Sequence, residues 1–224
     1  MWMGDLSRCD AGRAAAIARR VAAFVVLGWC LCAAAHAQAP PVVTRLTWPP
    51  VGAQWRYEET LSGTMGSGSK SVAMTRLADQ TFLDETYVAT QAGAETFLFT
   101  EDGAGIAILR DGVPTLRYLD PAPFFAWPMR VGASWSLEQR HVVFRNPKVV
   151  SQHVEAAVEA YETVATPAGD VAAFRIRMQM GTVRIMRWWS PALGVTVRYV
   201  YEIRLPDGRV GGRELIMTAL PRNP

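Results

Sequence analysis

The fold class is decided by a stretch in which every second residue is apolar: Val195-Thr196-Val197-Arg198-Tyr199-Val200-Tyr201-Glu202-Ile203-Arg204. Residues 172–180 repeat this alternation, with Phe174 and Ile176 on one side and Arg175 and Arg177 on the other. A period of two is typical of a β-strand that buries one face and exposes the other. The two stretches therefore predict an antiparallel sheet with one solvated face.

Working outward from these two stretches, the same pattern predicts further strands, most of them separated by turn residues such as Gly, Asn, Asp and Pro. Short turns connect antiparallel strands only, so the strands form a meander. Residues 152–163 also fit a helical stripe, but their alternation and their extended neighbours favour a strand. The other predicted strands are residues 53–61, 70–78, 81–90, 95–100, 104–110, 114–119, 134–145, 150–164, 182–189 and 209–219.

These strands predict an all-β fold: a curved antiparallel meander sheet that forms a partly closed barrel or half-barrel. Residues 51–58 (VGAQWRYE) recur as residues 131–138 (VGASWSLE), and each copy follows a Trp-Pro pair. The repeat indicates either two similar strand entries in one sheet or two related halves, residues 49–126 and 127–224. We expect residues 38–48 to be an extended lead-in and residues 49–224 to be a single β-rich domain.

The N-terminus is typical of an export signal. Arg13, Arg19 and Arg20 precede an apolar run over residues 21–35, and Ala35-His36-Ala37 fits a signal-peptidase site. The run is shorter than the roughly 20 residues that span a bilayer, which makes a retained anchor the weaker interpretation. We therefore predict a signal peptide over residues 1–37, cleavage after Ala37, and a periplasmic protein.

The composition excludes several classes of protein. Half of the 224 residues are hydrophobic, which excludes a disordered chain, and the formal net charge of +3 gives no footprint for nucleic acid. All three cysteines lie within residues 1–37, so the chain after the predicted cleavage has no disulfide and no thiolate ligand or nucleophile. We expect no cofactor, no nucleotide and no nucleic-acid partner.

The repeated VGxxW motif, together with residues 166–176 (TPAGDVAAFRI) and 188–195 (WWSPALGV), resembles the DUF3108-like family of uncharacterised exported bacterial proteins. The chain departs from the family pattern at Asp170-Val171, where the family has phenylalanine, and at Ala192-Leu193, where it has glycine. The family is distantly similar in expected shape to the periplasmic lipoprotein carriers. The resemblance implies a curved sheet around a hydrophobic hollow.

Motifs of catalysis are scarce. Residues 63–71 (GTMGSGSKS) resemble a phosphate-binding loop, but Ser69 separates the glycine from Lys70 and a hairpin tip is the better interpretation. His141 and His153 form no chelating pair, and there is no GxSxG elbow. Met178 and Met180 share the buried face of a predicted strand, which favours core packing over a copper site.

Aromatic residues give the remaining signal, because six tryptophans follow the predicted cleavage site. They either fill a thin core or line a groove for an apolar ligand. Trp188 and Trp189 are adjacent, so at most one of them enters the core directly. We expect Arg198 and Arg204 to lie outside the hollow. The candidate ligand-binding residues are Trp55, Trp135, Trp188, Trp189 and Tyr199.

The first functional hypothesis is a non-catalytic periplasmic protein that binds a lipid, an acyl chain or a hydrophobic envelope partner in an aromatic-lined concave sheet. The second is an envelope assembly or scaffold protein that recruits other chains through strand edges. The third is a hydrolase that uses His141 or His153 with an acidic residue.

Overall fold

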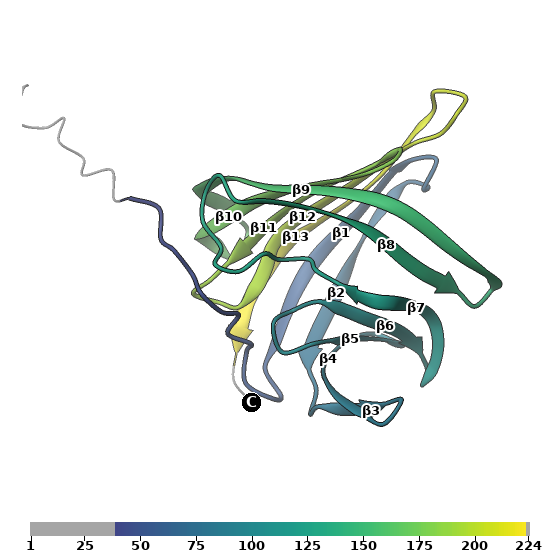
Figure 1. Cartoon of the computed structure of the whole chain (residues 1–224). Helices are drawn as coiled ribbons and strands as arrows, with labels where there is room; N and C mark the ends of the chain where they lie inside the picture. The colour runs from purple at the N-terminus through teal and green to yellow at the C-terminus, as the bar shows by residue number, and fades with distance from the viewer. Residues whose placement is uncertain (1–38, 223–224) are drawn as a thin grey trace, which may run out of the picture. The chain divides into compact units, whose positions relative to one another are not determined.

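The computed structural model describes residues 39–222, and all regular structure within them is β (Figure 1). This confirms the predicted all-β fold class. The strands are β1 (Gln54–Gly63), β2 (Gly68–Arg76), β3 (Gln80–Phe82), β4 (Glu85–Ala92), β5 (Glu95–Phe99), β6 (Gly105–Arg110), β7 (Val113–Ala122), β8 (Ser134–Val143), β9 (Asn146–Thr166), β10 (Gly169–Met180), β11 (Val183–Ser190), β12 (Val195–Arg204) and β13 (Val210–Arg222).

The strands form one antiparallel sheet in which every strand from β4 to β13 pairs with its successor in sequence. β13 then pairs with β1, and β1 pairs with β2. A short pairing of β2 with β4 joins the two ends, through Met74–Ala92, Thr75–Gln91 and Arg76–Thr90. The sheet is therefore a closed barrel, with β3 as an extra strand beside β4.

The structure changes one strand prediction. The predicted strand 81–90 is two strands, because Leu83 and Asp84 adopt positive φ values of 52° and 66° and form the turn between β3 and β4. Two-residue hairpin turns require this conformation, and the usual Gly or Asn signal is absent here. Residues 152–163 lie within β9, as the alternation predicts.

The predicted signal peptide lies outside the described residues, and residues 39–222 contain no helix able to span a membrane.

The repeated motif forms the same local structure twice. Gly52 and Gly132 have φ values of 87° and 86°, and each occupies a tight turn closed by a backbone hydrogen bond. The amide of each glycine then donates to a carbonyl on a neighbouring strand, that of Arg76 at 2.7 Å and that of Val158 at 2.9 Å. Each VGxxW copy thus forms a turn that is hydrogen-bonded to a neighbouring strand and is followed by a new strand. This new strand is β1 after the first copy and β8 after the second.

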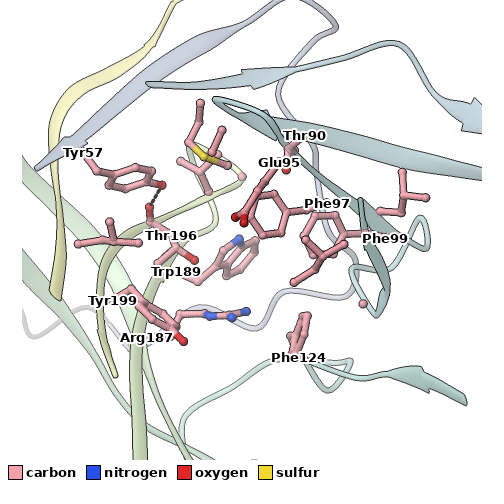
Figure 2. A pocket seen from close by; sticks show the side chains of 18 of the residues that line it. Tyr57, Thr90, Glu95, Phe97, Phe99, Phe124, Arg187, Trp189, Thr196 and Tyr199 are labelled. Carbon is pink, nitrogen blue, oxygen red and sulfur yellow. Dashed lines mark hydrogen bonds between the residues drawn. The ribbon is translucent and has the colours of Figure 1, made fainter. Parts of the chain in front are cut away.

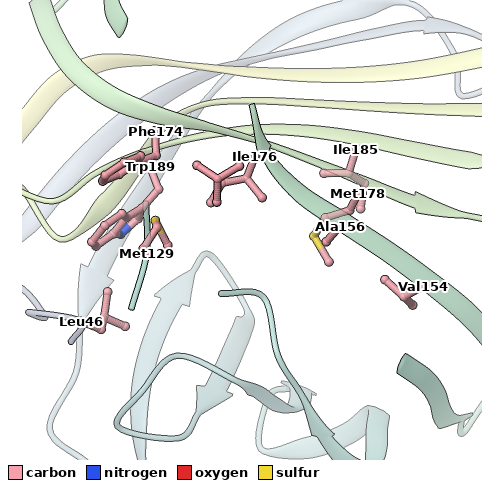
Figure 3. Close-up of a cluster of buried hydrophobic side chains, with 10 residues drawn as sticks. Leu46, Met129, Val154, Ala156, Phe174, Ile176, Met178, Ile185 and Trp189 are labelled. Atoms are coloured by element: carbon pink, nitrogen blue, oxygen red, sulfur yellow. The ribbon is translucent and has the colours of Figure 1, made fainter. Parts of the chain in front are cut away.

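Part of the barrel interior is filled by two segments that lie outside the strands. The lead-in pairs with the β7–β8 connection through Val43 and Met129, whose amides donate to each other's carbonyls at 2.9 Å and 2.7 Å. Figure 3 shows Leu46 and Met129 beside the inward side chains of β9, β10 and β11. This cluster comprises Leu46, Met129, Val154, Ala156, Val158, Phe174, Ile176, Met178, Ile185 and Trp189. The predicted extended lead-in is therefore packed against the core.

Gly194, in the WWSPALGV motif, holds the β11–β12 turn against the lead-in. Its φ is +68°, and a Cβ there would lie 1.9 Å from the Thr47 carbonyl oxygen. Gly181 has a similar φ of +54° with nothing within 4 Å of an added Cβ. We expect Gly194→Ala to lower the free energy of unfolding by about 3 kcal/mol and Gly181→Ala by about 1 kcal/mol. Urea denaturation of both variants measures this difference, and equal losses would contradict the contact with Thr47.

Candidate functional site: the interior cavity

The barrel contains a partly open cavity of about 380 Å³ beside the filled part of the core. Cavities that bind small ligands usually measure about 300–1,000 Å³, so this one is large enough for a ligand. One wall consists of side chains from β1, β2, β11, β12 and β13, and the other of side chains from β4, β5 and β6. Tyr118 within β7, Phe124 and Phe125 after β7, and Leu46 and Trp48 of the lead-in complete the lining (Figure 2).

The strand register explains how the lining is built. Thr90, Phe97 and Ile108 are neighbours across β4, β5 and β6 and all three line the cavity. On the opposite wall Trp55 and Tyr57 alternate along β1 and both point inward. Because side chains on alternate residues of a strand share a face, each strand contributes two or three groups to the same wall.

The polar atoms of the β1 wall are mutually satisfied. The indole nitrogen of Trp55 donates to the Tyr57 hydroxyl at 2.9 Å, and that hydroxyl donates to the Thr196 carbonyl at 2.5 Å. Burial raises the pKa of Tyr57 well above its usual value, so this hydroxyl stays protonated. The part of this wall formed by Trp55 and Tyr57 therefore presents ring surface, and the Trp55 indole N–H and the Tyr57 hydroxyl both have acceptors.

Arg187 is the exception in this apolar lining. Its guanidinium carbon lies 4.9 Å from the ring centre of Phe124, 5.5 Å from that of Phe125 and 5.8 Å from that of Tyr199. Figure 2 shows the side chain extending into the cavity between Tyr199 and Phe124. Burial lowers the pKa of Arg187, and its buried Nε has no hydrogen-bond partner among the described residues. The cavity therefore contains a cation without an acceptor for this N–H.

The other charged groups of the lining are paired. Glu95 accepts from Arg110 at 2.6 Å, and Arg213 forms an ion pair with Glu59. Glu59 also accepts from Lys70 at 2.9 Å. Glu95 and Arg213 thus each have a partner of opposite charge, whereas no ion pair involves Arg187 among the described residues.

Three of the five predicted ligand-binding residues line the cavity: Trp55, Trp189 and Tyr199. Trp189 is 1% exposed and packs against the rings of Phe125 and Trp127, with ring centres 5.4 Å and 5.7 Å apart. Its indole nitrogen has no hydrogen-bond partner among the described residues. Their role in ligand binding stays a prediction.

Trp135 and Trp188 are not among the residues that line this cavity, and their role in ligand binding also stays a prediction. Trp135 packs at the border of the filled core, where its indole nitrogen donates to the Pro123 carbonyl at 3.2 Å. Trp188 donates to Glu162 at 2.7 Å and lies 4.9 Å from the guanidinium of Arg198, which pairs with Glu214. Adjacent residues on a strand face opposite ways, so Trp189 enters the interior and Trp188 joins this charged cluster.

Neither histidine is among the residues that line the cavity. His153 is exposed and contacts Glu138 at 2.8 Å, and the ring of His141 packs edge-on against Tyr118, with centres 6.1 Å apart. Burial lowers the pKa of His141. Within residues 39–222 no cluster of three His, Cys, Asp or Glu side chains could hold a metal ion.

Arg187 was not predicted from the sequence, although a signal for it exists. On β11 the inward positions are Val183, Ile185, Arg187 and Trp189, so one arginine interrupts an otherwise apolar face. The pairing of β11 with β12 shifts by one residue between Trp188 and Trp189, because Val197 of β12 is an extra residue at this point, and the period of two along β11 is unbroken. An arginine on the buried face of a strand is rare without a partner or a function.

Ionisation of Tyr118, which lines the cavity, makes the stability of the fold depend on pH in the alkaline range. Burial raises its pKa to about 12, whereas an unfolded chain ionises tyrosine near about 10. The unfolded state therefore loses its proton first, and the stabilisation present below about pH 10 is lost as the pH rises toward about 12. Raising the pH from neutral to 11 lowers the free energy of unfolding of both proteins. We expect urea denaturation to show that this decrease is about 1 kcal/mol smaller in Tyr118→Phe than in the wild type. Equal losses would show that Tyr118 is accessible to hydroxide in the folded state.

No protein-family model and no curated protein matches the chain. Similar solved structures include an exported protein with a YmcC-like fold from Bacteroides fragilis, with 11% identity and a TM-score of 0.42 over 80% of this chain and 100% of that one. A proposed lipoprotein from Parabacteroides distasonis has 13% identity and a TM-score of 0.38 over 79% and 99%. The hypothetical lipoprotein YmcC from Escherichia coli has 9% identity and 0.35 over 73% and 83%. These likenesses assign no function, and the DUF3108-like resemblance stays a prediction.

Proposed function

We propose that this protein is a non-catalytic envelope protein that binds an apolar ligand, such as a lipid acyl chain, inside its barrel. The observation that carries the proposal is the cavity of about 380 Å³, with aromatic side chains on both of its walls. Trp55 and Tyr199 lie on one wall, and Phe97 and Phe99 on the other. An apolar chain between these rings would be removed from water along its whole length.

The contrast between the two parts of the interior supports this function. Around Phe174 and Trp189 the barrel is filled, and both side chains are at most 1% exposed. Protein interiors are otherwise close-packed, and an unfilled volume costs free energy because its lining loses contacts. A large cavity beside a packed core is therefore typical of a binding site.

The lining favours binding over catalysis. Its protein groups are rings, aliphatic side chains, paired charges, tyrosines and Arg187. A hydrolase built on His141 or His153 would need one of them in the cavity, and neither belongs to its lining. The scaffold alternative relies on open strand edges, and the pairing of β2 with β4 closes the main sheet.

The proposed location follows from the sequence. Residues 1–37 have the pattern of a signal peptide, and cleavage after Ala37 would release the chain into the periplasm. The lead-in from residue 40 is packed against the barrel core through Val43 and Leu46. A carrier of acyl chains in this compartment would shield them from water between membranes.

Val72 and Ala73 on β2 provide a matched pair of positions for the test. Val72 lines the cavity and is partly exposed, whereas Ala73 is exposed on the opposite face of the same strand. We expect Val72→Trp to weaken dodecanol binding at least about tenfold, or ~1.4 kcal/mol, because the indole occupies the cavity. Ala73→Trp should leave the affinity unchanged. Isothermal titration calorimetry measures both, and an unaffected Val72→Trp, or a wild type that binds neither dodecanol nor any charged twelve-carbon amphiphile, would refute the proposal.

A further inference from the structure

Arg187 places a positive charge at one position in a mostly apolar cavity. Three aromatic rings surround its guanidinium within 5.8 Å, and the groups that act on its charge are the hydroxyls of Tyr199, Tyr118 and Tyr57. Burial raises the pKa of each of these tyrosines, so all three are neutral at physiological pH. No carboxylate of the described residues forms an ion pair with Arg187.

A buried cation without a counter-ion is costly to maintain, because removal from water disfavours the charged form. Cation–π contacts offset part of this cost but leave the Nε–H, which lies in the plane of the guanidinium, without an acceptor. Arg187 therefore lacks the acceptor that such a group normally has. A planar, negatively charged oxygen group is the partner that a guanidinium binds best.

A second donor without an acceptor lines the same cavity. The indole nitrogen of Trp189 is buried and unpaired among the described residues. Arg187 and Trp189 are two residues apart on β11, so both side chains leave the same face of that strand. Figure 2 shows the Trp189 ring and the Arg187 side chain in the same part of the cavity. Two donors from one strand without acceptors indicate a ligand that brings acceptor oxygens.

The rest of the lining suits the remainder of such a ligand. Away from Arg187 the walls consist of apolar groups such as Val72, Met74, Phe97 and Leu215. Glu95 also points into the cavity, but its ion pair with Arg110 neutralises its charge. The cavity thus combines one cationic position with an apolar volume.

We infer that the ligand is an amphiphile with an anionic head, a carboxylate or a phosphate, that binds at Arg187 and extends its alkyl chain between the aromatic walls. The inference rests on the proposed function, because it names the chemical class of the ligand of that same cavity. Trp189 donates a further hydrogen bond to the head. A neutral or cationic head of the same chain length leaves Arg187 unpaired.

Calorimetric titration of the wild type with four twelve-carbon probes tests the head group. The probes are dodecanoate, dodecyl phosphate, dodecanol and dodecyltrimethylammonium, each below its micelle concentration. We expect at least one anionic probe to bind at least about tenfold tighter than dodecanol, and the cation to bind more weakly than dodecanol. The order of the two anions distinguishes a carboxylate head from a phosphate head.

Two variants assign the preference to Arg187. Arg187→Met replaces the guanidinium with an apolar side chain of similar length and should reduce the ratio of anion affinity to dodecanol affinity to within about twofold. Arg187→Lys keeps the charge and should retain part of the preference. If the wild type binds dodecanol as tightly as both anions, or Arg187→Met keeps the preference, the inference is wrong and the proposed function stands. If no probe binds, both are wrong.

Discussion

The structure depends on the short pairing that closes the sheet, which ends at Arg76. Its backbone pairs with Thr90 on β4 and exchanges hydrogen bonds with Gly52 and Ala53 in the turn before β1. Its side chain is buried and donates to the Ala89 carbonyl at 3.2 Å and to Asp79 at 2.5 Å. One arginine thus joins the first hairpin, the β4 strand and the entry turn. Without this closure the sheet would be an open curve with two unprotected edges.

Closure turns the concave side of the sheet into an interior that must be filled or enclosed. The lead-in and the β7–β8 connection fill one region through Leu46, Met129 and the rings that surround Trp189. The cavity occupies the region that they leave free, and Phe124 and Phe125 form the border between the two. Because Arg187 lies against both of these rings, the packed core fixes the position of the cation in the cavity.

Local patterns predicted the strands because a period of two is visible within ten residues. The register that closes the barrel involves Met74–Arg76 and Thr90–Ala92, and no local pattern marks such a long-range pairing. The Leu83-Asp84 turn was not predicted from the sequence for a different reason: the pair is not one of the usual pairs in a two-residue turn with positive φ. At the site, alternation predicted that Trp188 and Trp189 face opposite ways but not which of them is inside. The facing strands decide this, as they also decide that Arg187 meets three aromatic rings.

Native mass spectrometry of the protein, isolated from the cell envelope without detergent exchange, tests most directly whether the barrel carries a ligand. The account predicts a population with the mass of one bound amphiphile, and fragmentation of that population should release an anion with an alkyl chain. A spectrum that contains only the mass of the polypeptide, under conditions in which a pre-loaded dodecanoate complex survives, would contradict it.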